Sequence, residues 1–304
     1  MRRRIGGSLT VNAQTVGLVG LGLVGRALAA RLALAGRQVL AYDRDAQAMQ
    51  AYAAAGGRCA DTLGAMGRQT NAVVLAVYDT AGVIEVLEGA AGLLQPGHRV
   101  DLVVDCSTGS PKELTSLHAR LLARNVDLVE APLSGSSEQI AAGEAAALVG
   151  ATPGAWTRAQ PLLSALATRC LHAGPPGMGV RAKLATNLVL GLNRAVFAEG
   201  LSFAQALGIE PARFLEMVLA TPAASEAARV KGPLMVERDF RPRSRVRQHL
   251  KDVELMLAAA ADQGLALPLS NIHAQLLREA VADGDGDLDN AAIVRRWSAR
   301  AKPQ

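Results

Sequence analysis

Short apolar runs alternate with helical segments through the first half of the chain. The runs cover residues 15–20, 38–43, 72–77, 100–107, 127–132 and 145–150. Segments of helical composition separate several of them, at 21–36, 45–55, 80–88 and 112–124. Continuous apolar strands alternating with helices are typical of a parallel sheet covered on both faces. The pattern predicts an α/β fold in which residues 13–175 form a doubly wound N-terminal domain.

After about residue 175 the strand pattern stops. The remaining apolar patterns have helical spacing, at 211–220, 222–237, 250–263 and 268–282. We therefore expect residues 176–304 to form an all-helical C-terminal domain that begins with one long interdomain helix.

That long helix is predicted over residues 177–208. Pro175 and Pro176 precede it and Gly208 ends it, which are common start and stop signals. A helix that is apolar on nearly every side is expected to be buried, here between two bodies of structure. Its apolar positions are Val180, Leu184, Leu188, Leu190, Leu192, Val196, Phe197, Leu201, Phe203 and Leu207.

Polar residues interrupt this apolar helix on one face. Lys183 and Asn187 are four residues apart and therefore share a face, and Arg194 lies farther along the same stripe. Polar groups in a buried helix need partners or a function. One interpretation is a catalytic pair. The other is a lysine whose head reaches solvent and a core amide bonded to the backbone.

Composition limits the class of protein. The 304 residues are enough for two domains. No run of about 18 apolar residues lacks a charged residue, so we expect no membrane span. Residues 1–14 have a basic start without an apolar segment behind it, so we expect a short disordered leader rather than a secretory signal. The three cysteines are isolated in the sequence, which fits reduced thiols in a cytoplasmic protein.

The net charge of +5 is modest, although arginines cluster at residues 2–4 and 241–247. Only nine aromatic residues (two Trp, three Tyr, four Phe) could stack on bases, and no nucleic-acid motif accompanies the charge. We expect no nucleic-acid partner; solvated arginines or an anion pocket explain the clusters better.

A glycine turn follows the first predicted strand. Residues 20–25 read G-x-G-x-x-G and open a helix, which is the dinucleotide-binding pattern of a Rossmann domain. Such a triplet alone could be a structural turn, but here an acidic residue, Asp43, ends the second strand as well. Asp43 favours NAD, whereas the adjacent Arg44 could pair with the 2′-phosphate of NADP. We expect NAD, without excluding NADP. The predicted cofactor residues here are Gly20, Leu21, Gly22, Leu23, Val24, Gly25, Asp43 and Arg44.

Three further motifs follow in order: DCSTGSP at 105–111, APLSGS at 131–136, and GMG at 177–179 ahead of Lys183 and Asn187. A later Lys251-Asp252 pair completes the set. With these motifs, residues 15–295 resemble the β-hydroxyacid dehydrogenase family, which includes 3-hydroxyisobutyrate dehydrogenases and tartronate semialdehyde reductases. The resemblance implies hydride transfer between a nicotinamide cofactor and a small, carboxylate-bearing β-hydroxyacid or semialdehyde.

The resemblance also implies residue roles. Lys183 would act as general acid or base on the substrate oxygen, and Asn187 would orient the substrate or the lysine. Further substrate contacts would come from Thr108, Ser134, Gly135 and Ser136. Further cofactor contacts would come from Val77, Ser107, Thr108 and Lys251.

Four departures from the family pattern concern the substrate rather than the fold. Ser136 stands where the loop usually has a second glycine, and Glu130 where Asp is common. Ala291 replaces a usual serine, and Ser244 and Gln248 occupy positions before Lys251 that are usually apolar. A smaller or more polar substrate is therefore plausible.

Two rival functions stay open: an imine reductase on the same scaffold and a non-catalytic dinucleotide-binding sensor. Lys183 argues against the first, and the intact pair of Lys183 and Asn187 against the second. The histidines lack metal-ligand spacing, and residues 283–294 fail as a calcium loop, so we expect no metal. The apolar outer faces of the long helix predict a homodimer or higher homo-oligomer packed through the helical domain.

Overall fold

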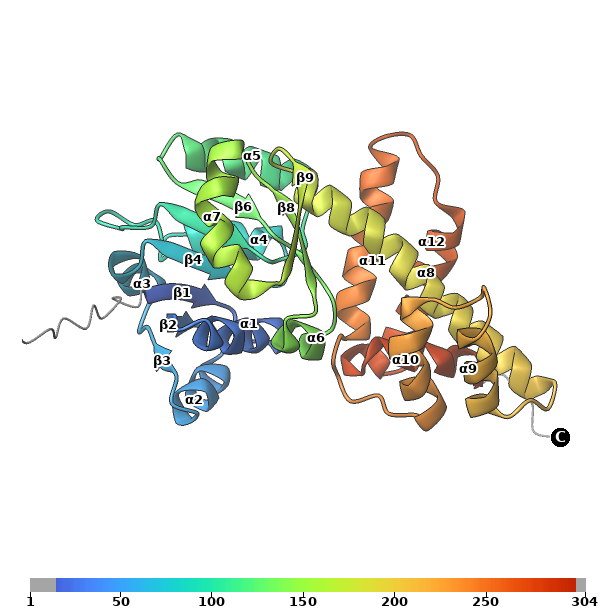
Figure 1. Ribbon diagram of the computed structural model, residues 1–304. Helices are drawn as coiled ribbons and strands as arrows, with labels where there is room; N and C mark the ends of the chain where they lie inside the picture. The colour runs from blue at the N-terminus through green and yellow to red at the C-terminus, as the bar shows by residue number, and fades with distance from the viewer. Residues whose placement is uncertain (1–14, 299–304) are drawn as a thin grey trace, which may run out of the picture.

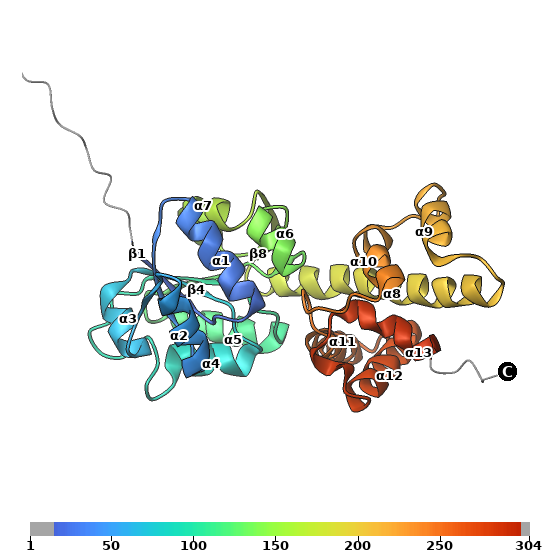
Figure 2. The same cartoon turned by 90° about the horizontal axis from the view of Figure 1, so that it is seen from below.

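The computed structural model describes residues 15–298. The predicted leader at 1–14 and the ends assigned to the two domains, at 13–14 and 299–304, lie outside the described residues. Two bodies share one long helix: a sheet covered by helices, and a helical body (Figures 1 and 2).

Within residues 15–298 the sheet has nine strands in the order β3-β2-β1-β4-β5-β6-β8-β7, with β9 paired to β8. The strands from β3 to β6 are parallel, and β1 pairs with β2 in register from Thr15 with Gln38 to Val19 with Tyr42. The strand bounds are β1 (Thr15–Val19), β2 (Gln38–Tyr42), β3 (Arg58–Cys59), β4 (Ala72–Leu75), β5 (Leu102–Asp105), β6 (Asp127–Glu130), β7 (Leu133–Ser134), β8 (Ala146–Gly150) and β9 (Arg169–Gly174).

The prediction of a wholly parallel sheet is wrong at one edge. Strand β8 runs antiparallel to β6 and β7, with Glu130 opposite Gly150. An antiparallel neighbour needs no crossover helix, and the connection from β6 to β8 holds only the two-residue β7 and the six-residue α6 (Ser137–Ala142). The fold class, a Rossmann-like sheet domain followed by a helical body, is as predicted.

Helices cover both faces of the sheet because successive strand residues point to opposite sides. Val73 and Leu75 belong to one hydrophobic core, and Val74 between them to the other. The second core also contains residues of α1, α6 and α7, and the first contains residues of α3, α4 and α5. The remaining helix bounds are α1 (Leu23–Leu34), α2 (Ala46–Ala54), α3 (Leu63–Gln69), α4 (Thr80–Glu88), α5 (Pro111–Leu122) and α7 (Pro153–Leu166).

Several of these elements were not predicted from the sequence. Strand β9 is largely exposed and so lacks an apolar run, and α7 contains Pro161 in its interior. The short elements β3, β7, α3 and α6 offer too few residues for a period to emerge.

The helical body is organised around α8 (Met178–Ala206), which the yellow ribbon shows leaving the sheet and running through the other helices (Figures 1 and 2). Its start is fixed by Glu130 at the end of β6, whose carboxylate accepts hydrogen bonds from the Gly177 and Val180 amides. The other elements are α9 (Pro211–Leu219), α10 (Glu226–Glu237), α11 (Val246–Ala261), α12 (Pro268–Ala282), two 3₁₀ turns, η1 (Asp285–Asp287) and η2 (Asn290–Val294), and α13 (Arg295–Ser298).

The expectation that α8 is buried on every side is wrong for one stripe. Val189, Val196 and Phe203, seven residues apart, are 56%, 67% and 64% exposed. A spacing of seven places them on one helix face. Within the described chain nothing covers this face, whereas the opposite face carries buried Lys183, Asn187 and Arg194.

Candidate active site

A cavity of about 400 Å³ lies where the ends of the central strands meet α8 and α11. It is lined from both bodies, so neither body forms it alone. Nine residues predicted for the site line it: Gly22, Leu23, Val24, Val77, Ser107, Thr108, Gly135, Lys183 and Asn187.

The glycine turn shapes one wall of this cavity. Gly20 has a φ of 99°, and a Cβ there would lie 2.3 Å from the Ala76 carbonyl oxygen. A Cβ on Gly25 would lie 1.8 Å from the Gly20 carbonyl oxygen, so helix α1 could not pack so closely. Gly22, in contrast, has no atom within 4 Å of such a Cβ. Open space at the N-terminus of α1 fits a pyrophosphate.

Asp43 lies beside this turn at the end of β2, as predicted for a ribose-binding acid. Its Oδ2 accepts a hydrogen bond from the Leu21 amide at 2.6 Å, and its Oδ1 accepts one from the Asp45 amide at 2.9 Å. Arg44 next to it is exposed and has no hydrogen bond or ion pair to any described residue. Neither side chain lines the cavity, nor do Gly20, Leu21 and Gly25.

The loop after β5 contributes the adjacent wall. Asp105 is buried, and its Oδ1 accepts a hydrogen bond from the Ser107 amide at 2.9 Å. The Ser107 hydroxyl accepts one from the Val77 amide at 3.1 Å. These bonds hold Ser107 and Thr108 at the cavity, on the side of the glycine turn.

The loop at residues 134–136 meets the cavity differently from the prediction. Gly135 lines it, but Ser134 and Ser136 do not. The Ser136 hydroxyl caps α6 by accepting a hydrogen bond from the Gln139 amide at 3.2 Å, and the Gln139 side chain accepts one from the Ser136 amide. Ser137, which sequence reasoning passed over, lines the cavity instead.

Lys183 and Asn187 are brought together on α8 as their spacing predicts. Both are buried, and the Lys183 Nζ donates a hydrogen bond to the Asn187 Oδ1 at 2.9 Å. The Asn187 Nδ2 donates to the Asp252 Oδ2 on α11 at 3.0 Å. Burial lowers the pKa of Lys183 to about 8, against the opposing charge of Asp252. A lysine with such a pKa can give and take a proton near neutral pH.

Lys251 occupies a bridging position rather than the cavity wall. Its Nζ donates hydrogen bonds to the Tyr78 carbonyl oxygen at 2.8 Å and the Thr108 carbonyl oxygen at 2.6 Å. It also lies 3.1 Å from the Asp252 Oδ1, as an ion pair. Lys251 therefore joins α11 to the two loops that follow β4 and β5.

Several lining residues were not predicted for the site. Among them, Arg243, Arg245 and Arg247 belong to the arginine cluster in which an anion pocket was one alternative. Each is paired with acids: Arg243 with Glu138 and Asp239, and the other two with Asp287. Their alternate spacing in the sequence was the available signal. The further lining residues are Ala76, Tyr78, Cys106, Leu133, Leu190, Arg194, Ser244, Gln248, His249, Asp252, Asp287 and Asn290.

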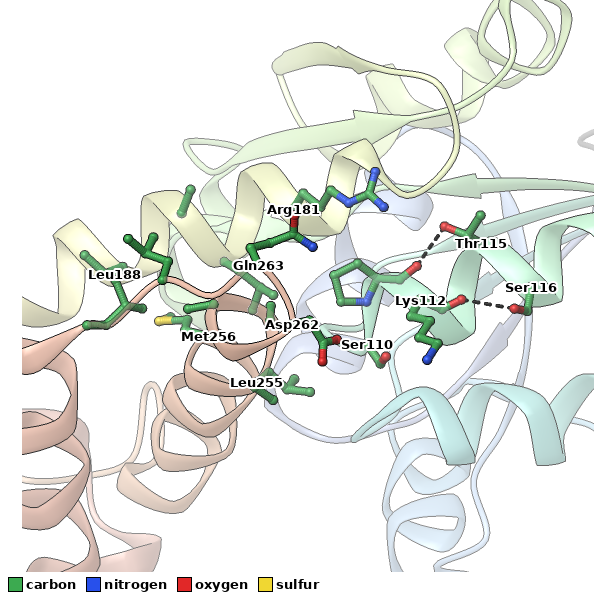
Figure 3. A pocket seen from close by; sticks show the side chains of 18 residues that line it. Ser110, Lys112, Thr115, Ser116, Arg181, Leu188, Leu255, Met256, Asp262 and Gln263 are labelled. Carbon is green, nitrogen blue, oxygen red and sulfur yellow. Dashed lines mark hydrogen bonds between the residues drawn. The ribbon is translucent and has the colours of Figure 1, made fainter.

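A larger cavity of about 810 Å³ lies on another side of α8, between α5 and α11 (Figure 3). Leu184, Leu188 and Met256 lie on its wall, and Lys112, Arg181 and Asp262 are its charged residues. It touches neither the glycine turn nor Lys183. The smaller cavity is therefore the candidate active site.

No group of three or more His, Cys, Asp or Glu side chains within residues 15–298 could hold a metal ion. No helix in that range is long and apolar enough to cross a membrane.

Two family models match successive parts of the chain. Residues 15–174 match the family model described as the NAD binding domain of 6-phosphogluconate dehydrogenase. Residues 177–297 match that described as NAD-binding of NADP-dependent 3-hydroxyisobutyrate dehydrogenase. The chain belongs to the β-hydroxyacid dehydrogenase family. It is an NAD(P)-dependent oxidoreductase acting on a CH–OH group.

Three relatives illustrate the similarity. The chain is 27% identical over 284 residues to 2-(hydroxymethyl)glutarate dehydrogenase of Eubacterium barkeri, covering 93% of this chain and 94% of the relative. It is 28% identical over 280 residues to 2-hydroxy-3-oxopropionate reductase of Escherichia coli (strain K12), covering 92% and 96%. The crystal structure of 3-hydroxyisobutyrate dehydrogenase from Salmonella typhimurium superposes with a TM-score of 0.82 at 29% identity, covering 93% and 99%.

Proposed function

We propose that this oxidoreductase interconverts a small β-hydroxyacid and the corresponding semialdehyde, with Lys183 as the proton donor and acceptor. The observation that carries the proposal is the buried ammonium of Lys183, held at the cavity by a neutral amide and with a pKa near 8. Two relatives support the substrate class, since by name one acts on a hydroxymethyl diacid and one on a hydroxy-oxo acid.

In this proposal the role of each residue follows from its position at the cavity. A bound nicotinamide supplies or accepts the hydride. Lys183 protonates the carbonyl oxygen during reduction and deprotonates the hydroxyl during oxidation, while Asn187 fixes its ammonium. Such a positioned group contributes roughly 10²–10⁴ in rate. Gly135 and Ser137, at the cavity wall, would hold the substrate carboxylate.

The cofactor would lie along Gly22, Val77, Ser107 and Thr108, which line the cavity on the side of the glycine turn. We propose NAD as the preferred form. Asp43 carries its negative charge next to the turn, where it would repel a 2′-phosphate. Arg44 is the residue that could still accept NADP.

The two rival functions make different predictions. The lysine at this position serves alcohol chemistry, which an imine reductase does not need. A sensor needs no proton donor. The placement of Lys183 at the cavity with a lowered pKa supports turnover of a carbonyl substrate instead.

We also propose that the protein is a cytoplasmic homodimer or higher homo-oligomer packed through the exposed stripe of Val189, Val196 and Phe203 on α8. Exposed apolar faces of this kind mark interfaces. Replacing Val196 and Phe203 together by glutamate should shift the mass in light scattering from oligomer to monomer. A wild-type protein that is monomeric at micromolar concentration would contradict the proposal.

The direct test of function is oxidation of NADH, followed at 340 nm, with a panel of carboxylate-bearing semialdehydes and 2-oxo acids. One cyclic imine and a parallel series with NADPH complete the panel. Turnover of a semialdehyde but not of the imine is expected, and faster with NADH. If no compound is turned over although NADH binds, the sensor function is the better explanation.

A further inference from the structure

Among residues 15–298, nothing is hydrogen-bonded to the buried guanidinium of Arg194. It lies on α8, is 4% exposed and lines the candidate active site. Its Nη2 is fully enclosed and has no partner, and the Arg194 side chain makes no hydrogen bond or ion pair with any described residue. Buried charged groups in proteins are ordinarily paired, because taking an unpaired charge out of water is costly.

The nearby carboxylates are engaged elsewhere. Asp289 and Asp252 are the acids whose charges act on Arg194. The two carboxylate oxygens of Asp289 accept hydrogen bonds from the Lys231 Nζ, at 2.8 and 2.9 Å. They also accept hydrogen bonds from three backbone amides. Asp252 is bonded to Asn187 and lies against Lys251. Among the described residues, therefore, no carboxylate is hydrogen-bonded to Arg194 or forms an ion pair with it.

Two histidines beside Arg194 offer it no negative charge. The ring centroids of His249 and His273 lie 5.1 Å apart. Both rings pack against Gly191, one turn before Arg194. Burial and the charge of Arg194 lower the pKa of both histidines, that of His273 to about 4. Asn290, which also lines the cavity, has a buried Oδ1 without a partner among the described residues. This end of the cavity is built around one unneutralised positive charge.

The cofactor is not the missing anion. Its phosphates would lie at Gly22 and its ribose at Asp43, on the sheet side of Lys183. Arg194 follows Asn187 by seven residues, about 10 Å along the helix axis on the side away from the sheet. An anion that reaches Arg194 past Lys183 and Asn187 belongs to the substrate.

We propose that Arg194 binds a second anionic group of the substrate, so that the enzyme acts on hydroxyacids that carry two acidic groups. This inference rests on the proposed function. One acidic group would lie at Gly135 and Ser137, the reacting carbon at Lys183, and the second acidic group at the Arg194 guanidinium. Arginine suits this place because its guanidinium stays charged when buried and carries several N–H donors for an anion.

The test compares dicarboxylates with monocarboxylates of the same carbon number on the full-length protein saturated with NADH. Malonate, succinate and glutarate are titrated against propionate, butyrate and pentanoate by calorimetry. At least one dicarboxylate should bind at least tenfold more tightly than its matched monocarboxylate. Arg194→Met and Arg194→Gln should abolish that preference, and Arg194→Lys should keep part of it.

Arg247→Gln is the matched control, because it removes an arginine of the same cavity that is paired with Asp287. It should leave most of the preference in place, and thermal unfolding establishes that each variant is folded. If Arg194→Met does not fold, Arg194→Gln and Arg194→Lys carry the comparison. The inference is wrong if dicarboxylates have no advantage in the wild type, or if the advantage survives in folded Arg194→Gln.

Turnover separates this inference from the proposed function. If monocarboxylic semialdehydes are reduced and no dicarboxylate preference exists, the function stands and the role of Arg194 is wrong. If no substrate is turned over but dicarboxylate binding depends on Arg194, the anion site stands and the reaction is wrong.

Discussion

Two regions of the helical body each bury a lysine, and they use it differently. Lys183 and Lys231 are 7% and 6% exposed. In one region Lys231 on α10 donates to both oxygens of Asp289, which is 0% exposed and also accepts three backbone amides. In the other, Lys183 on α8 donates to a neutral amide, Asn187, beside a cavity.

The difference lies in the partner rather than in burial. Burial lowers the pKa of both lysines, and in each case an aspartate opposes it. Lys231 is bonded directly to its carboxylate, which keeps the proton in place. Lys183 reaches Asp252 only through Asn187, and burial lowers its pKa to about 8. A buried lysine with a neutral partner and an open cavity is suited to proton transfer, and one with a carboxylate to holding loops together.

The largest effect should come from Lys183→Met. Loss of the proton donor should lower kcat by roughly 10²–10⁴-fold. The methionine fills similar space, so NADH affinity and the unfolding temperature should stay close to those of the wild type. Steady-state kinetics with the best semialdehyde of the panel, and NADH binding by fluorescence, measure the two effects. Turnover that is unchanged would remove Lys183 from the mechanism.

Lys231→Met should have the opposite profile. It leaves the Asp289 carboxylate buried without its cation, and breaking a buried pair in this way costs about 3–5 kcal/mol. Urea unfolding should show this loss, while kcat of the folded fraction stays within about twofold of the wild type. The double variant Lys231→Met with Asp289→Asn is the control and should recover part of the stability. A loss of kcat without a loss of stability would contradict the comparison.

The pH dependence should distinguish the two directions of reaction. Reduction needs protonated Lys183, so kcat for reduction should fall about tenfold per pH unit above about pH 8. Oxidation needs the neutral amine, so its kcat should fall about tenfold per pH unit below about pH 8. Stopped-flow rates with saturating cofactor measure both limbs. Two limbs that bend in the same direction would exclude Lys183 as the titrating group.

The smallest effect should come from Asn187→Asp, which makes the surroundings of Lys183 resemble those of Lys231. A carboxylate at hydrogen-bond distance should raise the pKa of Lys183 by about one unit or more. The falling limb for reduction should therefore move to higher pH by that amount. Asn187→Ala is the control, since it removes the bond without adding charge and should not move the limb upward.

Much of the sheet body could be predicted because its signals are local. The glycine turn is required by close contacts at Gly20 and Gly25, and such contacts leave a glycine spacing in the sequence. The long helix α8 was predicted from its bounding residues and its apolar content. Elements without a local signal, such as the exposed β9, were missed.

The positions of site residues could be predicted from the sequence where the residues lie on the same helix or in the same loop. Lys183 and Asn187 meet because a spacing of four places them on one helix face. Ser136 and Lys251 are two residues whose contacts could not be predicted from the sequence. The hydroxyl of Ser136 is used by the cap of α6, and the ammonium of Lys251 by the carbonyl oxygens of Tyr78 and Thr108. Neither engagement is visible in the residue type or its spacing.

The sequence by itself determined the α/β class, the dinucleotide turn and the polar stripe on α8, because periodicity and turn chemistry act over a few residues. Only the tertiary structure decided which buried cations are neutralised. Lys231 meets Asp289 across 58 residues of chain, and Arg194 meets no carboxylate at all among the described residues. Pairing over such separations depends on how α8, α10 and the turn before η2 pack, and no local pattern encodes that.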